Sequence, residues 1–190
     1  MNRATNQVRG IQTSAKEAFY SRNGYGDRCV QPPIDYIART REQYSALGYP
    51  PYDWVHNSDE PPFATPSKPL NEASVGLIAS GGIYVKGQIA FHFRDDFSYR
   101  EIDNRTPPAA LRATHFAYDL KDVRKDANVV FPLETLHEIA AAGVVGEVGP
   151  RAYTFMGGIY SSRKVTEILA PALADRLVTD EVDLALLVPA

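Results

Sequence analysis

Val75–Ser80 (VGLIAS) is the stretch of sequence that decides the fold. It is a short apolar run in which polar and apolar residues do not alternate, and the pair Gly81-Gly82 follows it directly. Runs of this kind are typical of a strand that is buried on both faces of a parallel sheet. We therefore expect a buried parallel strand at this position.

Further strand and helix signals follow this run in alternation. Thr114–Asp119 and Glu147–Phe155 contain β-forming residues, and Val182–Val188 is a strongly apolar run. Two helical stripes lie between them: Leu133, Leu136, Ile139 and Ala140, which stop at Gly143, and Ile168, Leu169, Leu173 and Leu177, which are interrupted at Pro171. Strand, crossover helix and strand predict an α/β fold with a layered, mostly parallel sheet and flanking helices. Residues 83–113 have no clean period.

The N-terminal part of the chain has a different character. Residues 1–32 are polar and end at a proline pair, so we expect an arm that is partly ordered at best. Residues 34–47 have apolar positions at helical spacing before Gly48, which predicts an amphipathic helix with a glycine stop.

Residues 49–69 interleave prolines with large aromatic residues. This pattern predicts either an extended strap whose aromatic side chains pack on the domain or a free proline-rich ligand for another protein. We favour the strap, because free linkers are usually poor in large aromatic residues. The expected organisation is an arm (1–32), a helix and strap (33–69) and an α/β domain (70–190).

The composition excludes several classes of protein. The chain has 190 residues, 44% hydrophobic and 23% charged, which describes one soluble domain or at most two small ones. A net charge of -3 gives no reason to expect a nucleic-acid or acidic-membrane partner. A single cysteine, Cys29, excludes an internal disulfide framework and a multi-cysteine metal cluster. Since neither a signal peptide nor a membrane-length apolar run is present, we expect a cytoplasmic protein.

A short motif occurs twice: Gly81–Tyr84 repeats letter for letter as Gly157–Tyr160. Both copies follow predicted strands, and two explanations stay open. The glycines supply tight turns at no steric cost, or their bare backbone lets a ligand approach the carboxyl ends of parallel strands. The first copy lacks the spacing of a P-loop or a dinucleotide site.

The predicted strand Thr114–Asp119 carries the best candidates for chemistry. In an extended segment, His115 and Asp119 share one face, where they would form a base and its orienting carboxylate, with Tyr118 as an acid nearby. The alternative is that His115 bonds a backbone carbonyl in the core while Asp119 caps a turn. The remaining histidines have no metal-ligand spacing, so we predict no metal site. Cys29 is either a thiol activated by nearby arginines or an incidental exposed cysteine.

Several segments together resemble the selenoprotein B family of glycine, sarcosine and betaine reductases and its D-proline reductase relatives. They are VGLIASGGIYVKGQIAFHF, DDFSYREID, THFAYD, DANVVFPLETLHEIAAAGVVGEVGPRAYTFMGG and VDLALLVPA, which span roughly residues 70–190. The segment LGYPPYDWVHNSDEPPFATPSKPL looks like the one that precedes the core in shorter relatives. The order of the segments carries the resemblance.

The resemblance implies reductive cleavage of a carbon–nitrogen or other carbon–heteroatom bond in a small amine or amino-acid-like substrate. It also implies a pyruvoyl-bearing partner that binds the amino group and an external thiol or thioredoxin-type reductant, while no bound cofactor is predicted. The family's reactive cysteine or selenocysteine follows a strand like LALLVPA, whereas this sequence ends at Ala190.

Three explanations for this difference stay open. The chain is incomplete, either because a selenocysteine codon was read as a stop or because it was cut; it is a naturally short relative; or Cys29 replaces the nucleophile. We favour the selenocysteine stop, because a strongly apolar final strand normally continues into a loop and a covering helix. The same uncovered strand predicts a homo-oligomer or a hetero-complex.

The expected site combines these observations. The candidate catalytic residues are His115, Tyr118 and Asp119, with Tyr118 donating to the leaving amine. The candidate substrate-binding residues are Gly81, Gly82, Phe155, Met156, Gly157 and Gly158, whose glycine amides would hold a substrate carboxylate. The alternative to an enzyme component is a non-catalytic binding or scaffold subunit of the same fold.

Overall fold

The structure is a computed structural model that describes residues 35–51, 55–61 and 63–190. The chain divides into two compact units, residues 1–56 and 57–190, and we describe each by itself. The predictions for the arm 1–32, including Cys29, lie outside the described residues, as do Tyr52 and Trp54 of the predicted strap.

The first unit contains one described helix, α2 (Tyr36–Ala46). The Asp35 side chain caps its first turn by accepting a hydrogen bond from the Ala38 amide at 3.0 Å. The helix ends before Gly48, which has a φ of 75°. A glycine adopts this left-handed conformation without a steric penalty, so the predicted glycine stop is confirmed.

The second unit is built around β1 (Ser74–Ala79), in which every residue is buried. On one side β1 pairs in parallel with β5 (Glu147–Val148) and β6 (Arg151–Phe155), and on the other with β7 (Leu184–Val188). The strand β3 (Tyr99–Asp103) pairs antiparallel with β6 at the edge of the sheet. The predicted mixed α/β fold with a mostly parallel sheet is therefore confirmed.

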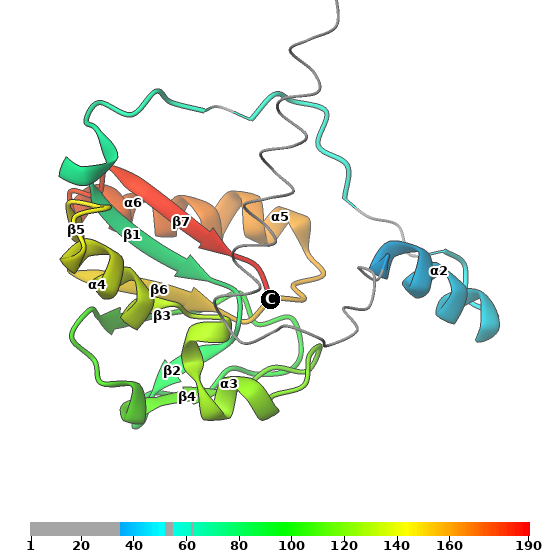
Figure 1. Ribbon diagram of the computed structural model, residues 1–190. Coiled ribbons are helices and arrows are strands. Elements are labelled where there is room, and N and C mark those ends of the chain that lie inside the picture. The colour runs from blue at the N-terminus through cyan, green and yellow to red at the C-terminus, as the bar shows by residue number, and fades with distance from the viewer. Residues whose placement is uncertain (1–34, 52–54, 62) are drawn as a thin grey trace, which may run out of the picture. The chain divides into compact units, whose positions relative to one another are not determined.

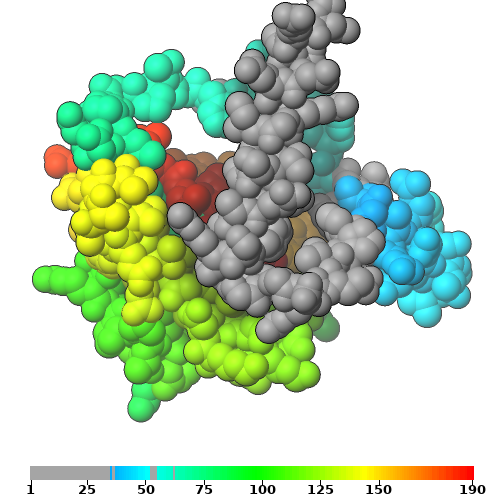
Figure 2. Space-filling model, viewed as in Figure 1, coloured from blue at the N-terminus to red at the C-terminus, as the bar shows by residue number. Residues whose placement is uncertain are grey.

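Helices cover both faces of this sheet (Figure 1). Alternate residues of β1 point to opposite faces, so Leu77 packs in the cluster that includes α4 (Leu133–Ala141), and Ile78 packs in the cluster that includes α6 (Ala170–Thr179). Figure 2 shows the residues of α4, in yellow, on one of these faces. Both predicted helical stripes are present.

The second stripe changes helix type along its length. It begins as α5 (Ser162–Lys164), continues as a π-helical turn (Val165–Leu169) and becomes α6, with Pro171 in its first turn. Proline is tolerated there because the first helical amides have no partner within the helix. The interruption predicted at Pro171 is present in this form.

The segments without a clear sequence signal form a second, smaller sheet. β2 (Ile83–Val85) and β4 (Leu111–Ala113) pair antiparallel and lie close to α3 (Lys121–Lys125) in Figure 1. The prediction of a strand at Thr114–Asp119 is wrong, since the chain leaves β4 and bends there. A side chain in the bend, His115, accepts a hydrogen bond from the Ala117 amide, and this local bond competes with a strand ladder.

The prediction that the aromatic side chains of the strap pack on the domain is wrong for Phe63, an aromatic residue of the strap in the second unit. The side chain of Phe63 is 93% exposed and does not pack on the domain. A polar contact holds this segment instead: Lys68 Nζ lies 2.8 Å from the carboxylate of Asp183. The same carboxylate accepts a hydrogen bond from the Ser74 amide. Asp183 precedes β7, so this contact joins the segment to the sheet.

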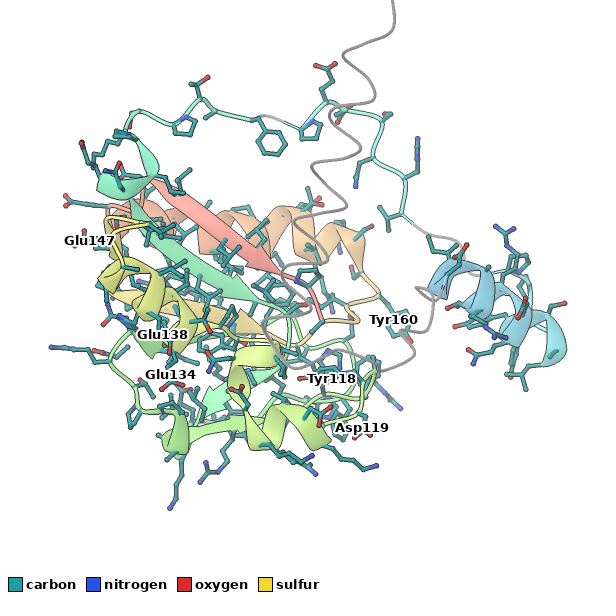
Figure 3. All side chains as sticks on the ribbon, viewed as in Figure 1. Tyr118, Asp119, Glu134, Glu138, Glu147 and Tyr160 are labelled. Atoms are coloured by element: carbon teal, nitrogen blue, oxygen red, sulfur yellow. The ribbon has the colours of Figure 1, made fainter. Side chains whose placement is uncertain are left out.

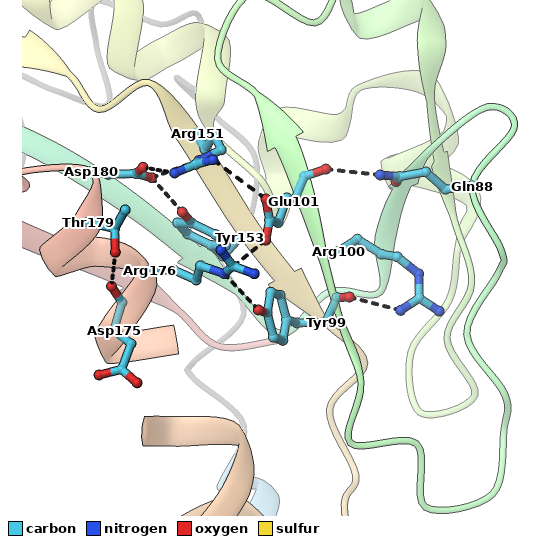
Figure 4. Close-up of polar contacts among 10 residues, drawn as sticks. All are labelled: Gln88, Tyr99, Arg100, Glu101, Arg151, Tyr153, Asp175, Arg176, Thr179 and Asp180. Atoms are coloured by element: carbon cyan, nitrogen blue, oxygen red, sulfur yellow. Dashed lines mark hydrogen bonds and ion pairs between the residues drawn. The ribbon is translucent and has the colours of Figure 1, made fainter. Parts of the chain in front are cut away.

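A charged cluster holds the turn between α6 and β7 against the sheet (Figure 4). Asp180 is buried and accepts hydrogen bonds from Arg151 and from the Tyr153 hydroxyl, both on β6. Burial opposes ionisation of Asp180, but the bonds from Arg151 and Tyr153 outweigh it and lower the pKa of the carboxyl. Arg176 of α6 extends the cluster by pairing with Glu101 of β3 at 3.1 Å.

The edge strand β7 is apolar and partly uncovered. Leu186 and Leu187 have exposed fractions of 38% and 67%. An apolar edge of this kind can pair with another chain. Across the part of the chain that the structure describes, no helix has the length and apolarity needed to cross a membrane.

Candidate functional site

The two copies of the repeated motif meet in space. β1 and β6 are parallel neighbours, so Gly81 and Met156, which follow them, form an isolated bridge. The Gly157 amide donates to the Ser80 carbonyl at 2.8 Å, and the Gly82 amide donates to the Phe155 carbonyl at 2.9 Å. We call these residues, together with His115–Tyr118 and Ala190, the strand-end cluster.

The second glycine of each copy adopts a left-handed conformation, with a φ of 68° at Gly82 and 78° at Gly158. A Cβ at Gly82 would lie 2.0 Å from the Thr114 carbonyl oxygen, and one at Gly158 would lie 2.4 Å from the Phe116 ring. The tight-turn explanation of the repeat therefore holds at both positions. Ligand approach to this backbone stays a prediction.

His115 is buried at the centre of the cluster, with an exposed fraction of 5%. Its ring stacks on Phe116 at a centroid distance of 5.5 Å and lies 4.6 Å from the Tyr118 ring. Nδ1 accepts the Ala117 amide at 3.0 Å, and within the described residues Nε2 meets no acceptor with the geometry of a full hydrogen bond. Burial lowers the pKa of His115, and a weak hydrogen bond with the Ser80 backbone opposes part of that shift. The ring is therefore neutral near pH 7.

Tyr118 lies beside His115 as expected, whereas Asp119 does not orient the ring. The Tyr118 hydroxyl donates to the Gly81 carbonyl at 2.7 Å, and burial raises its pKa. Asp119 accepts the Lys121 amide at 3.0 Å and pairs with the amino group of the same residue. Because the segment bends, the geometry that would place Asp119 against His115 is absent, and the Ala117 amide contacts Nδ1 instead. Figure 3 shows Tyr118 and Asp119 on the side of the domain away from Glu147.

The predicted substrate-binding residues divide into two groups. Met156 is 1% exposed, so its side chain belongs to the core, and Phe155 packs partly buried beside Tyr153. The amides of Gly82 and Gly157 already donate to backbone carbonyls, as described above. The prediction that glycine amides hold a carboxylate therefore rests on Gly81 and Gly158.

Ser80 is a member of the cluster that the sequence reasoning missed. Its hydroxyl accepts the Ala190 amide at 2.9 Å, which fixes the main chain just after β7. A Cβ placed on Gly157 would lie 3.3 Å from both the Ala190 carbonyl oxygen and His115 Nε2. The chain leaving β7 and the ring of His115 thus approach the same point beside Gly157. The available signal was a hydroxyl residue at the end of a buried strand, directly before a glycine pair.

Asp95 is a second residue that sequence reasoning missed. It accepts the Tyr160 amide at 3.0 Å, and its other carboxylate oxygen lies 2.8 Å from Lys164 Nζ. The hydrogen bond from Lys164 lowers the pKa of Asp95. Asp95 has a φ of 50°, a conformation that aspartate tolerates better than most residues. Its contacts hold the loop that follows Gly158.

We expect Asp95→Ala to loosen this loop without unfolding the domain. The amides of Tyr160 and Ser161 lose their acceptor, so hydrogen exchange should become faster at these positions and stay unchanged in β1. Asp103→Ala, which removes an exposed contact with Arg105, is the matched control. Unchanged exchange at residues 160 and 161 would contradict the role given to Asp95.

Two of the cavities formed by the described residues lie near α4 and α3, away from the cluster. One of about 210 Å³ lies beside α4, between the loop after β3 and Phe131, and one of about 1010 Å³ lies between β4 and α3. Neither is lined by a residue of the strand-end cluster. Among the described side chains, no group of three or more His, Cys, Asp or Glu residues is arranged to hold a metal ion.

The described domain is thus a layered α/β unit whose parallel strands end at a glycine-rich, histidine-containing cluster. Residues 42–190 match the family of glycine/sarcosine/betaine reductase selenoprotein B proteins, and the chain belongs to this family. It is 33% identical over 128 residues to the D-proline reductase subunit gamma of Acetoanaerobium sticklandii. The aligned region covers 67% of this chain and 53% of the relative. The chain therefore spans about half the length of the curated relative that it matches. No solved structure matches the chain.

Proposed function

We propose that this chain is a component of a selenoprotein B-type reductase that cleaves a carbon–nitrogen bond in a small amine or amino-acid-like substrate. The observation that carries the proposal is the position of His115. Its Nε2 and the Ala190 carbonyl oxygen approach the same point beside Gly157, and the family resemblance places the reactive cysteine or selenocysteine on the chain that leaves β7. The reducing compartment suggested by the single cysteine makes the cytoplasm its place of action.

The proposed reaction needs a nucleophile, a proton for the leaving group and two electrons. A selenolate or thiolate attacks the substrate carbon while the carbon–nitrogen bond breaks, and the amine leaves with a proton. A thiol reductant then supplies two electrons and releases the reduced product. A pyruvoyl-bearing partner binds the amino group beforehand and makes it a better leaving group.

The strand-end cluster supplies three parts of this scheme. His115 is the proposed neighbour of the nucleophile, and Tyr118, whose ring lies 4.6 Å from that of His115, is the proposed proton donor. The amides of Gly81 and Gly158 are the donors proposed for the substrate carboxylate. The contacts of Asp119 do not support a role for it in orienting the ring.

The test is an assay of the reductase assembled from this subunit, complete with its nucleophile, and its partner subunit. The assay follows dithiol-dependent cleavage of D-proline, glycine, sarcosine and betaine. We expect turnover of at least one substrate, a loss of about 100-fold or more in His115→Phe, and unchanged turnover in the exposed control His92→Phe. Assembly without turnover of any amine would favour the alternative of a non-catalytic scaffold subunit.

Tyr118→Phe separates a structural role from a catalytic one. The variant loses the hydrogen bond to the Gly81 carbonyl, so we expect a fall of about 1 kcal/mol in the free energy of unfolding, measured with urea. Proton donation to the leaving amine predicts, in addition, a lower kcat with little change in KM. A stability change with normal kcat would leave Tyr118 as a structural residue.

The uncovered edge of β7 supports assembly as a homo-oligomer or a hetero-complex. Leu187→Lys places a charge on that edge, and we expect it to weaken association at concentrations where the unmodified chain self-associates. Sedimentation velocity measures the change, with Val178→Lys as the control because Val178 is also largely exposed but lies on α6. Identical behaviour of the two variants would argue against β7 as the interface.

A further inference from the structure

The smaller sheet consists of β2 and β4 alone, so β4 has an outer edge that pairs with no described strand. The Thr114 amide donates to the Gly82 carbonyl at 2.9 Å, which shows that Thr114 turns its main chain toward β2. Successive residues of a strand turn their main-chain groups to alternate sides. Leu111 and Ala113 therefore turn their N–H and C=O groups toward the outer edge of β4.

Ala113 is the open position on this edge. The Leu111 amide donates to the Pro108 carbonyl, and its own carbonyl accepts the Arg112 guanidinium at 2.7 Å, so both groups of Leu111 are engaged. Ile83, which lies opposite Ala113, donates its amide to the Thr154 hydroxyl and not to β4.

In the described part of the chain, no bond outside the β2–β4 ladder engages the N–H or the C=O of Ala113. Ala113 thus offers a donor and an acceptor on one residue, which is the unit with which an added strand pairs.

A groove runs along this edge. It is the cavity of about 1010 Å³ between β4 and α3, and side chains of α4 also line it. Pockets for small organic ligands enclose roughly 300–1,000 Å³ and are mostly apolar. Charged side chains line much of this groove, and its volume reaches the upper limit of that range. Size and lining therefore favour an extended chain over a small molecule as the occupant.

Opposite charges line the groove from two different helices. Arg124 comes from α3, whereas Glu134 and Glu138 come from α4 (Figure 3). Glu134 accepts a hydrogen bond from Asn128 at 3.1 Å. Across the residues that the structure describes, neither Arg124 nor Glu138 forms an ion pair. An occupant that carries one acidic and one basic side chain would complement both groups.

We propose that the groove between β4, α3 and α4 binds an extended peptide segment of a partner protein, which adds to the edge of β4 by pairing with Ala113. An acidic side chain of the peptide lies toward Arg124, and a basic one lies toward Glu138. The main-chain bonds hold the peptide, and the charged side chains select its sequence. No residue of the strand-end cluster lines the groove, so the inference does not rest on the proposed function.

Three synthetic peptides test strand addition on the full chain. The probe is acetyl-Lys-Val-Thr-Val-Thr-Val-Glu-amide, the second peptide carries N-methyl groups on its valines, and the third carries them on its threonines. A strand pairs with a neighbour through one of its two edges. We therefore expect one methylated peptide to bind as the probe does and the other to lose about tenfold or more in affinity.

The NMR shift of the Ala113 amide measures binding of each peptide. Equal affinities of the two methylated peptides would mean that charge alone attracts them, and this result would overturn the proposal. The absence of any shift at Ala113 with millimolar probe would overturn it as well.

Variants of the chain test the two sets of contacts separately, with a fluorescent probe peptide and its anisotropy as the readout. Ala113→Pro removes the donor, and an edge strand tolerates proline where the N–H faces outward, so we expect an intact fold and loss of binding. Normal binding by a folded Ala113→Pro chain would contradict strand addition. If this variant does not fold, the two methylated peptides still decide the question on the unmodified chain.

Arg124→Glu tests the charges of the groove. We expect it to weaken binding of the probe by about two- to fivefold. Arg94→Glu, which changes an exposed arginine that does not line the groove, is the matched control and should bind as the unmodified chain does. Equal effects of the two variants would contradict the contact between Arg124 and an acidic side chain of the peptide.

Discussion

Gly82→Ala is expected to lower the free energy of unfolding by more than about 3 kcal/mol, enough to unfold much of a marginally stable domain. The added Cβ would lie 2.0 Å from the Thr114 carbonyl oxygen, which is main chain and cannot rotate away. The same carbonyl belongs to a residue whose amide donates to the Gly82 carbonyl at 2.9 Å. Relief of the clash would therefore break the link between the end of β1 and the segment that carries His115.

Gly143→Ala is the matched control for this prediction. Gly143 has a φ of 72°, close to the 68° of Gly82, but a Cβ there would have no atom within 4 Å. We expect this variant to cost only the conformational term of about 1 kcal/mol. Urea unfolding followed by circular dichroism measures both variants. Equal losses would mean that the positive φ, and not the contact with Thr114, makes Gly82 necessary.

The sequence predicted the regular part of this fold because that part depends on local pattern. The apolar run at β1, the stripe of α4 and the stop at Gly143 each have a period or a terminating residue of their own. The smaller sheet of β2 and β4 has three-residue strands, which are too short to show a period. Its existence depends on pairing between distant segments, and composition does not encode such pairing.

The candidate site, like the fold, could be predicted from the sequence only in part. The expectation that the ends of parallel strands meet brought the two glycine pairs together correctly, whereas His115 reaches them from a bend and not from the strand that was expected. The role given to Asp119 required an extended segment, and the bond between His115 and the Ala117 amide replaces that geometry with a bend. The contribution of Ser80 depends on its contact with Ala190, a pair that is far apart in the sequence and shares no motif.

Asp180→Ala is expected to cost about 3 kcal/mol and to displace β7. The variant leaves Arg151 and the Tyr153 hydroxyl without their partner, and Tyr153 is fully buried. We place the cost at the lower end of the range for buried pairs, because the Arg151 side chain is 35% exposed and water can replace part of the interaction. Asp122→Ala, which removes an exposed pair with Lys125, should have no measurable effect.

The pH dependence of stability gives a second readout of this cluster. The pKa of Asp180 is lower in the fold than in the unfolded chain, where it is about 3.9. The carboxylate therefore contributes stability that is fully present above about pH 4 and is lost as the pH falls through the folded pKa. Asp180→Asn should lack this part of the acid-induced loss, measured by urea unfolding across that range. If Asp180→Asn lost as much stability at low pH as the unmodified chain, the Asp180 carboxylate would titrate in the fold as it does in the unfolded chain.

The consequence for the strand-end cluster follows from how β7 is held. The Asp180 cluster fixes its beginning to β6, and the bond from Ala190 to Ser80 fixes its end beside His115. Release of the beginning should therefore be felt at the end, so Asp180→Ala is expected to speed hydrogen exchange at the Ala190 amide. Faster exchange at Ala190 in Asp180→Ala, together with unchanged exchange in Asp122→Ala, would show that the contacts of Asp180 help to hold both ends of β7. If exchange at Ala190 stays slow in Asp180→Ala, the bond to Ser80 alone is sufficient to hold the end of β7.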